Sequence, residues 1–311
     1  MRRKVELQFD LVLTNPPFQD TVKRKKTPHK LWIDFTLRVF SAFLKPGGSL
    51  VQVSPSSFAS PSNRVLALME QNQTKVLRMG TEHHFPEVGS TFSDYWIVKS
   101  PNSGEKTVIH AHDEIFEMRL SSDVFYIPND ACKQSMSIHT KVMFGDHPKA
   151  QVSWDYVAAH NIRRHDPEPS LVLEKDEVHK YPVFHTNRST WWSSIRQDWA
   201  GKKKVMWTRS GYTIPFFDDG IHGGTDMVYF ILVQTSKEGN TLAHNMNLNL
   251  MKYIYKTAKW SGFGNERVFS GLPKLSETKK LSDSDLYRQF GLTPEEVDYV
   301  ERSLVSSTKK T

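Results

Sequence analysis

The sequence predicts an α/β fold over residues 1–100, followed by a mixed α+β region. Strand-like and helix-like apolar segments alternate over the first hundred residues, which is typical of an α/β layer with a largely parallel sheet. Beyond the polar segment SPNSGE at 100–105, the sequence is aromatic, polar and irregular up to about residue 275, as expected of short strands joined by long loops. The predicted domains are therefore 1–100, 101–275 and a helical tail at 276–311.

The first elements follow from local signals. Residues 7–14, LQFDLVLT, read as a strand of branched apolar residues that Pro16 stops, because proline cannot donate to a central ladder. Residues 31–44, LWIDFTLRVFSAFL, carry apolar side chains at helical spacing on nearly every side, and Pro-Gly-Gly at 46–48 ends this helix. A second strand, SLVQVS, begins at residue 49.

A second helix and the tail helix have start signals of their own. Ser60 is the expected N-cap and Pro61 the first helical residue of a helix that runs into RVLALME. Thr293 and Glu296 flank Pro294 as a capping box for the tail helix. Further strands are expected at 75–80 and 92–100, and the apolar stripe of the tail helix comprises Val297, Val300 and Leu304.

Composition limits the classes of protein that fit. With 311 residues, 38% of them hydrophobic, the chain can bury a core. The single cysteine, Cys132, excludes a disulfide framework and fits a reducing compartment. No run approaches the ~20 apolar residues of a membrane helix, and residues 1–10 lack a signal-peptide segment, so a cytoplasmic protein is expected. The net charge of +7 indicates a polyanionic partner, a basic protein without a nucleic-acid role being the alternative.

The segment FDLVLTNPPFQD, residues 9–20, carries the strongest chemical signal. Pro16 and Pro17 fix two φ angles and lack N–H groups, so the turn is rigid and presents acceptors, the Asn15 amide oxygen and the Pro16 carbonyl. Two converging acceptors suit an amino group with two hydrogens, and Phe18 offers a face for a stacked base. Open α/β sheets bind ligands at the carboxyl ends of their strands. The motif predicts a site for the exocyclic amine of a planar base, a purely structural strand stop being the alternative.

Asn15-Pro16-Pro17-Phe18 resembles the catalytic motif of the amino-methyltransferases that modify adenine in DNA with S-adenosylmethionine. The resemblance implies that Asn15 and the Pro16 carbonyl accept hydrogen bonds from the adenine amine, whose nitrogen attacks the sulfonium methyl. It also implies that Phe18 stacks on the flipped base, and that Pro17, with Asn15, lies beside the cofactor. Segments 43–62 and 85–100 resemble those that follow the catalytic strand, and segments 259–275 and 286–301 resemble the end of the recognition domain of restriction-modification methylases.

The fold implied by this resemblance is a partial Rossmann-like methyltransferase sheet followed by a DNA target-recognition domain. Residues 1–100 would be the carboxyl-terminal half of the catalytic domain and 101–275 the recognition domain. The family's glycine-rich strand and its acidic ribose ligand are expected outside this chain, because only eight residues precede Phe9. The glycine pairs at 47–48, at 223–224 and at 262 and 264 do not supply a glycine turn that follows a strand.

A missing neighbouring strand has a structural consequence. Without it, residues 7–14 become an apolar edge strand, and neither an inward charge nor a bulge that would protect this edge is evident. The expected partners are therefore double-stranded DNA and an amino-terminal cofactor-binding polypeptide or a cognate restriction endonuclease system.

Candidate DNA contacts are basic residues in two places. One group directly follows the motif and would grip phosphates, a solvated loop being the alternative. The other lies among tryptophans, a mixture that nucleic-acid surfaces often use, although core tryptophans beside ordinary surface lysines explain it almost as well. The candidates are Lys23, Arg24, Lys25 and Lys26 in the first group, and Arg188, Lys202, Lys203 and Arg209 in the second.

The sequence gives little support for a metal site or for the carboxylate pair of a nuclease. His83-His84 and His110-x-His112 lack nearby cysteines or an HExxH helix, so no metal site is expected. Asp218-Asp219 resembles the carboxylate pair of a nuclease but has no third acidic residue at a suitable spacing.

The sequence therefore predicts an adenine-specific DNA methyltransferase of a restriction-modification or phage system, in a truncated or split form. A noncatalytic DNA-binding specificity subunit, or an inactive methyltransferase remnant, is the alternative, and cofactor binding distinguishes the two. Related motifs serve adenine and cytosine amines alike, so the target base remains open between these two.

Overall fold

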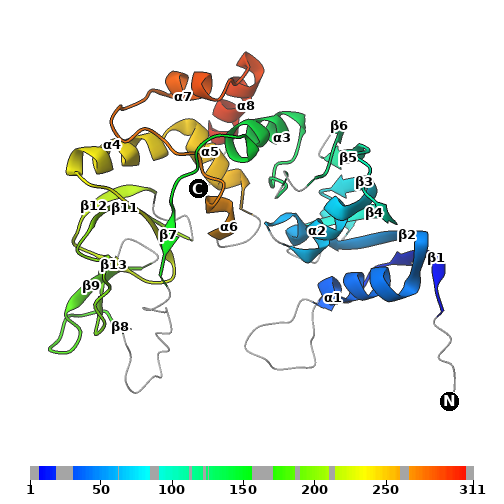
Figure 1. Ribbon diagram of the computed structural model, residues 1–311, viewed down its shortest axis with the longest axis horizontal. Helices are drawn as coiled ribbons and strands as arrows, with labels where there is room; N and C mark the ends of the chain where they lie inside the picture. Colours follow the sequence, from blue (N-terminus) through cyan, green and yellow to red (C-terminus); the bar gives the residue numbers. More distant parts are fainter. Residues whose placement is uncertain are drawn as a thin grey trace. The chain divides into compact units, whose positions relative to one another are not determined.

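The structure is a computed structural model (Figure 1) in which the chain forms two compact units, Met1–Ser137 and Ile138–Thr311. The first unit extends beyond residue 100, where the sequence suggested a boundary. None of the described helices is long and apolar enough to cross a membrane. The structure describes residues 7–18, 31–61, 63–84, 91–111, 114–121, 124, 126–155, 171–185, 190–209, 214–259 and 266–305.

The first unit contains a six-stranded sheet with the order β1-β2-β4-β3-β5-β6. The pairs β1–β2 and β3–β5 are parallel, whereas β4 is antiparallel to both of its neighbours and β6 to β5. The prediction of a largely parallel sheet is therefore wrong. Strand β4 lies between β2 and β3 and runs opposite to both, so three of the five neighbouring strand pairs are antiparallel. The strands are β1 (Phe9–Thr14), β2 (Leu44–Pro55), β3 (Asn72–Met79), β4 (Phe92–Pro101), β5 (Thr107–Ala111) and β6 (Glu114–Met118).

Two helices pack on this sheet, α1 (Leu31–Arg38), which a π-helical turn extends to Phe43, and α2 (Arg64–Gln71). The predicted helix start at Ser60-Pro61 is wrong, because the N-cap of α2 is Asn63. The Asn63 side chain accepts a hydrogen bond from Val65 N at 3.0 Å. Asparagine is among the strongest N-cap residues, so it takes this role closer to the apolar residues of the helix.

One face of the sheet is buried along its inner strands β2, β4, β3 and β5. Helix α1 lies on this face, since Gln52 Nε2 of β2 donates to Thr36 Oγ1 of α1 at 2.6 Å. Helix α2 contacts α1, and their surfaces are joined by the ion pair between Arg64 and Asp34 at 2.6 Å. The buried side chains that alternate along this face are Leu50, Gln52 and Ser54 of β2, Leu77 of β3, Ser93, Tyr95 and Ile97 of β4, and Ile109 of β5.

The opposite face of the sheet is not buried in the same way. Leu13, Val51 and Trp96 lie side by side across β1, β2 and β4, because Leu13 pairs with Val51 and Val51 with Trp96. Leu13 is 77% exposed and Trp96 is 42% exposed. We call this surface the open face; its residues are Leu11, Leu13, Val51, Val76, Trp96 and Val98.

Strand β1 is an edge strand of the described sheet, as the sequence predicted. Its pairing with β2 is irregular, because the register shifts between Phe9 and Leu11. Gly48 of β2 makes this approach feasible, since a Cβ there would lie only 3.0 Å from the Phe9 carbonyl oxygen. Asp10 projects from the same region and pairs with Lys45 at 2.9 Å.

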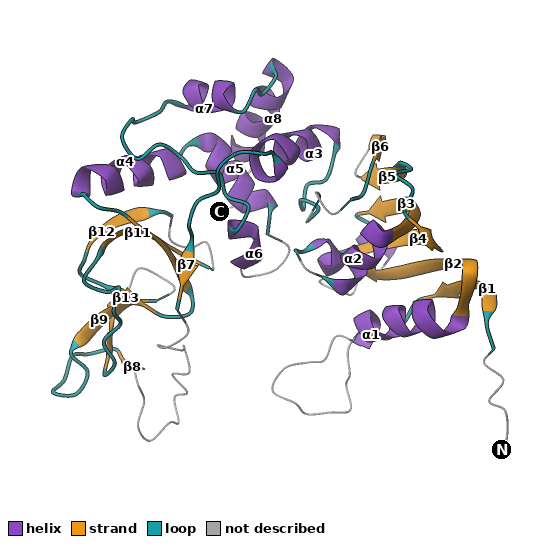
Figure 2. Ribbon diagram, in the orientation of Figure 1, coloured by secondary structure: helices purple, strands orange, loops and turns teal. Residues whose placement is uncertain are grey.

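The second unit contains two four-stranded sheets of short strands, as predicted, with the orders β12-β11-β14-β7 and β13-β9-β10-β8. Helices α4, α5, α7 and α8 form a layer next to the first of these sheets (Figure 2). The strands are β7 (Ser153–Trp154), β8 (Leu171–Val172), β9 (Tyr181–Phe184), β10 (Thr190–Ser193), β11 (Lys203–Thr208), β12 (Phe216–Asp219), β13 (Gly223–Gly224) and β14 (Val228–Leu232). Its helices are α4 (Ser236–Met246), α5 (Asn249–Thr257), α6 (Glu266–Phe269), α7 (Asp283–Gln289) and α8 (Pro294–Val305), while α3 (Lys133–His139) begins in the first unit and ends in the second.

The start of α8 confirms the predicted capping box. Glu296 N donates to Thr293 Oγ1 at 3.3 Å, and Thr293 N donates to Glu296 Oε2 at 2.7 Å. The stripe of this helix is also as predicted, with Val300 buried and Val297 and Leu304 half-buried.

Candidate active site

The segment Asn15–Phe18 directly follows β1 at the edge of the sheet where β1, β2, β3 and β5 all end. These four strands run in the same direction, so their carboxyl ends meet there. The two prolines end the ladder locally because neither has an N–H group to donate. Pro16 is buried, Phe18 is half-buried, and Asn15 and Pro17 are exposed.

The Asn15 side chain is available to a ligand. Within the described part of the chain, its amide makes no hydrogen bond. Its backbone position is defined on both sides, because Thr14 pairs with Gln52 of β2 and Pro16 restricts the conformation of Asn15. The amide oxygen is therefore an acceptor held by rigid backbone at the carboxyl edge of the sheet.

Phe18 rests on a second aromatic ring that the sequence did not single out. Its ring centroid lies 5.1 Å from that of Phe92, at an interplanar angle of 41°. Phe92 is buried, and its carbonyl oxygen accepts a hydrogen bond from Thr81 N at 3.0 Å. Ser56 N also donates to the Thr91 carbonyl at 3.0 Å. The ends of β2 and β3 thus anchor the ring that supports Phe18.

A buried polar network lies beneath the motif. Gln52 Nε2 donates to Thr36 Oγ1 and, at 2.8 Å, to Tyr95 Oη. Burial raises the pKa of Tyr95 to about 12, so this hydroxyl stays neutral. The network joins α1, β2 and β4 directly beside Thr14, and it stiffens the strand end that carries Asn15.

Two histidines also lie beyond the end of β3. The rings of His83 and His84 are 3.9 Å apart on an exposed turn. His110 lies on β5, and His112 falls outside the described residues. Among the described residues, no three histidine, cysteine, aspartate or glutamate side chains gather as metal ligands would.

The candidate DNA contacts divide between the described residues and the rest. Lys23, Arg24, Lys25, Lys26 and Arg188 lie outside the described residues. Lys202 is exposed, Lys203 is half-buried and ion-paired with Asp219, and Arg209 is half-buried. These three belong to the second unit, whereas Asn15–Phe18 belongs to the first.

Asp218 and Asp219 do not form a carboxylate pair. They are consecutive in β12, so their side chains point to opposite faces of the sheet. Asp218 is buried against Lys204 at 2.8 Å and hydrogen-bonded to His222 at 2.7 Å. Burial alone would raise the pKa of Asp218, but the hydrogen bonds from His222 and Lys204 outweigh it and lower the pKa to about 2. The carboxylate of Asp218 therefore holds its own strand and turn together.

Tryptophans near the second basic group pack within the second unit. Trp199 stacks on Phe230 with ring centroids 4.0 Å apart, and its Nε1 donates to Asp155 at 2.8 Å. Trp207 is buried in β11. Trp191 and Trp192 are half-buried in β10. Trp199 and Trp207 are therefore core side chains of this unit, as the structural alternative expected.

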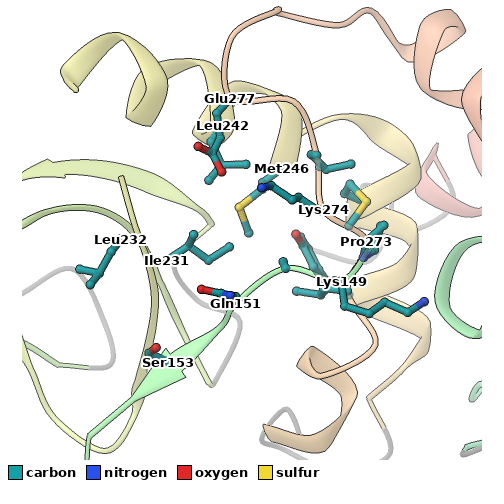
Figure 3. A pocket seen from close by; sticks show the side chains of 15 residues that line it. Lys149, Gln151, Ser153, Ile231, Leu232, Leu242, Met246, Pro273, Lys274 and Glu277 are labelled. Atoms are coloured by element: carbon teal, nitrogen blue, oxygen red, sulfur yellow. The ribbon is translucent and has the colours of Figure 1, made fainter. Parts of the chain in front are cut away.

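The second unit also contains cavities. One, of about 240 Å³, lies between the ends of β7 and β14, helix α4 and the segment 272–277 (Figure 3). Its lining combines apolar side chains such as Ile231 and Met246 with Lys149, Lys274 and Glu277. None of the site residues predicted from the sequence lines it, whereas Arg209 lines a second cavity of about 340 Å³.

Comparison with known proteins gives structural likenesses only. No family model matches the chain, and no curated protein matches it. The chain is similar to the Type IIL restriction-modification enzyme MmeI in complex with DNA, with 10% identity, 94% of this chain and 54% of that chain covered, and a TM-score of 0.39. It is also similar to the ATP-dependent Type ISP restriction-modification enzyme LlaBIII bound to DNA, with 10% identity, coverage of 96% and 28%, and a TM-score of 0.36.

A third likeness is to the M protein of the Type I restriction enzyme EcoKI, with 14% identity, coverage of 37% of this chain and 28% of that chain, and a TM-score of 0.28. The chain thus spans about half the length of the MmeI structure and less than a third of the other two. All three structures come from restriction-modification systems.

Proposed function

We propose that the chain is the catalytic-strand part and the target-recognition part of an adenine-specific DNA methyltransferase of a restriction-modification or phage system. The observation that carries this proposal is the placement of Asn15. Its available amide follows an edge strand at the carboxyl edge of the sheet, beside the Phe18 ring seated on Phe92. Residues 1–100 would belong to the catalytic domain, 101–275 to target recognition, and 276–311 to a helical tail.

The motif residues would act on the amine of a base turned out of the duplex. The Asn15 amide oxygen and the Pro16 carbonyl oxygen accept hydrogen bonds from the two N–H groups of the amine, which draws the nitrogen lone pair out of conjugation with the ring. Phe18, half-buried against Phe92, stacks on the base and offsets part of the cost of extruding it. S-adenosylmethionine supplies the methyl group as a sulfonium. The exposed Pro17 and Asn15 fit beside that group, because both are accessible at the same strand end.

The remainder of the cofactor site would come from a further polypeptide segment that covers the open face and pairs with β1. Exposed apolar patches on a protein surface mark interaction sites. Here one face is covered by α1 and α2, while Leu13 and Trp96 on the other remain exposed. A segment that supplies a strand next to β1 and helices on the open face would satisfy both features.

The test of this function is transfer of a labelled methyl group from S-adenosylmethionine to DNA by the chain together with such a segment. Mass spectrometry of the digested DNA identifies the product, and N6-methyladenine is expected. Detection of N4-methylcytosine instead would support methyl transfer to an exocyclic amine but would show that the target base is cytosine. DNA binding without any transfer would favour the alternative function, a noncatalytic specificity subunit or an inactive remnant.

Replacing Lys23, Arg24, Lys25 and Lys26 together with alanine is expected to weaken binding to every DNA sequence alike. The reason is that phosphate contacts carry no sequence information, and each one lost should flatten the slope of log affinity against log salt by ~0.9. Fluorescence anisotropy at several salt concentrations measures this slope. Lys280→Ala, which removes one exposed lysine from the second unit, is the matched control. An unchanged slope in the fourfold variant would assign these residues to a loop that does not touch DNA.

A further inference from the structure

The cavity of about 340 Å³ in the second unit contains an unusual set of buried polar atoms. In the described part of this unit, the buried side-chain polar atoms without a hydrogen-bond partner are Trp207 Nε1, Asn247 Oδ1 and Tyr255 Oη. All three residues line this same cavity. Buried polar atoms are rarely left without a partner, because their desolvation is then uncompensated. Their gathering around one cavity therefore indicates a polar ligand.

The orientation of these atoms follows from the surrounding structure. Asn247 Nδ2 donates to the Pro215 carbonyl at 2.6 Å and to the Ala243 carbonyl at 2.7 Å. These two bonds fix which end of the amide is nitrogen and leave Oδ1 as an acceptor. The Trp207 ring packs edge-on against Phe269 at 5.6 Å, with Nε1 as a donor.

The Tyr255 hydroxyl completes the set. Burial raises the pKa of Tyr255, so the hydroxyl is neutral and both donates and accepts. The cavity thus offers one donor, one acceptor and one group that serves as either, beside the aromatic rings of Trp207 and Phe269. The edge of a nucleobase presents donors and acceptors in this mixture, and its face stacks on aromatic side chains.

The charge of the lining selects an anion. No acidic side chain is among the described lining residues, whereas the cavity of Figure 3 combines its lysines with Glu277. Burial lowers the pKa of Lys259. Several basic side chains around one cavity favour a phosphate as the charged part of the ligand. The four cationic residues that line the cavity are Arg209, Lys252, Lys256 and Lys259.

We propose that this cavity, which we call the Trp207 cavity, binds one nucleotide. The base would meet Trp207, Asn247 and Tyr255, and the phosphate would meet the cationic residues. The volume is within the range of small-ligand sites. The nucleotide is either free in solution or part of a DNA strand and turned out of the duplex. The site belongs to the second unit and does not depend on methyl transfer at Asn15.

Calorimetric titration of the full chain with the four deoxynucleoside 5′-monophosphates tests this proposal. We expect binding at one site per chain, with deoxyribose 5-phosphate at least about tenfold weaker because it lacks the base. Tyr255→Phe and Trp207→Phe should each weaken the nucleotide by about fivefold to tenfold, the effect of one hydrogen bond. Lys252→Gln should weaken the nucleotide and also deoxyribose 5-phosphate. Lys237→Gln, an exposed lysine on α4 away from the cavity, should change neither.

The melting temperature of each ligand-free variant shows whether a loss of binding results from a loss of folding. Tyr255→Phe removes a hydroxyl that has no partner in the described structure, so the melting temperature of the ligand-free protein should not fall. A stable variant with weakened nucleotide binding supports the site. No binding of any mononucleotide or oligonucleotide at millimolar concentration overturns the proposal, as does binding that all the variants share with the wild type.

Oligonucleotides distinguish the two sources of the nucleotide. A duplex with one unpaired nucleotide should bind more tightly than the fully paired duplex if the source is DNA, and Tyr255→Phe should abolish this preference. If the source is a free nucleotide, the mononucleotide should bind and neither duplex should displace it. Because neither measurement uses methyl transfer, failure here is separate from failure of the proposed methyltransferase function.

Discussion

Replacing Asn15 with alanine is expected to lower methyl transfer to DNA by about a hundredfold or more, while DNA affinity changes by less than about threefold. The amide oxygen would be needed most as the amine nitrogen loses its conjugation, so its loss should affect turnover far more than binding. Because the side chain is exposed and unbonded in the described structure, stability should stay within about 0.5 kcal/mol of the wild type. The measurement is single-turnover transfer of labelled methyl groups by the reconstituted enzyme.

The matched control is Asn15→Asp, which keeps an acceptor oxygen of nearly the same shape at the same place. If the acceptor carries the effect, this variant should retain most of the transfer that Asn15→Ala loses. Equal losses in both variants would point to a requirement other than an acceptor. Unchanged turnover in Asn15→Ala would end the proposal that this motif binds the amine.

Replacing Leu11 and Leu13 together with lysine is expected to weaken self-association of the 311-residue chain by at least about tenfold. The wild-type chain should self-associate through β1 and the open face, because burying an exposed leucine contributes ~1.5–3 kcal/mol. Both leucines are more than half exposed, so the lysines should cost little stability. Sedimentation velocity over a range of concentrations measures the effect.

Leu173→Lys is the control, because Leu173 is 64% exposed but lies in the second unit. It should leave self-association unchanged.

The same proposal expects weak or no binding of S-adenosylmethionine by the wild-type chain alone, and tight binding once a segment carrying the glycine-rich strand is added. The lysine variant should fail to gain this binding. A monomeric wild-type chain that binds the cofactor tightly by itself would contradict the proposal.

The sequence predicts those parts of the candidate site that depend on neighbours along the chain. The end of the strand and the rigid turn at Asn-Pro-Pro-Phe can be predicted from the local sequence, because proline restricts its own backbone and that of the preceding residue. Phe92 lies far along the chain from Phe18, and the strand at 92–100 carries no local sign that its first residue supports another ring. The sequence does not predict the Trp207 cavity for the same reason, because Trp207, Asn247 and Tyr255 come from a strand, a helix end and a second helix.

Local patterns by themselves predicted a strand at 7–14, a strand at 92–100, a helix at 31–44 and the Thr293–Glu296 capping box, and the structure has these elements. The end of that helix was predicted wrongly, because Pro-Gly-Gly at 46–48 lies inside β2, which begins at Leu44. These features depend on spacings of two to four residues, which side-chain alternation and capping encode directly. Only the tertiary structure decided that β4 inserts antiparallel between β2 and β3, which sheet face α1 and α2 cover, and that Asp218 pairs with Lys204. The physical reason is that a periodic pattern shows which side of an element is apolar, whereas the partner of that side is chosen by packing between residues distant in sequence.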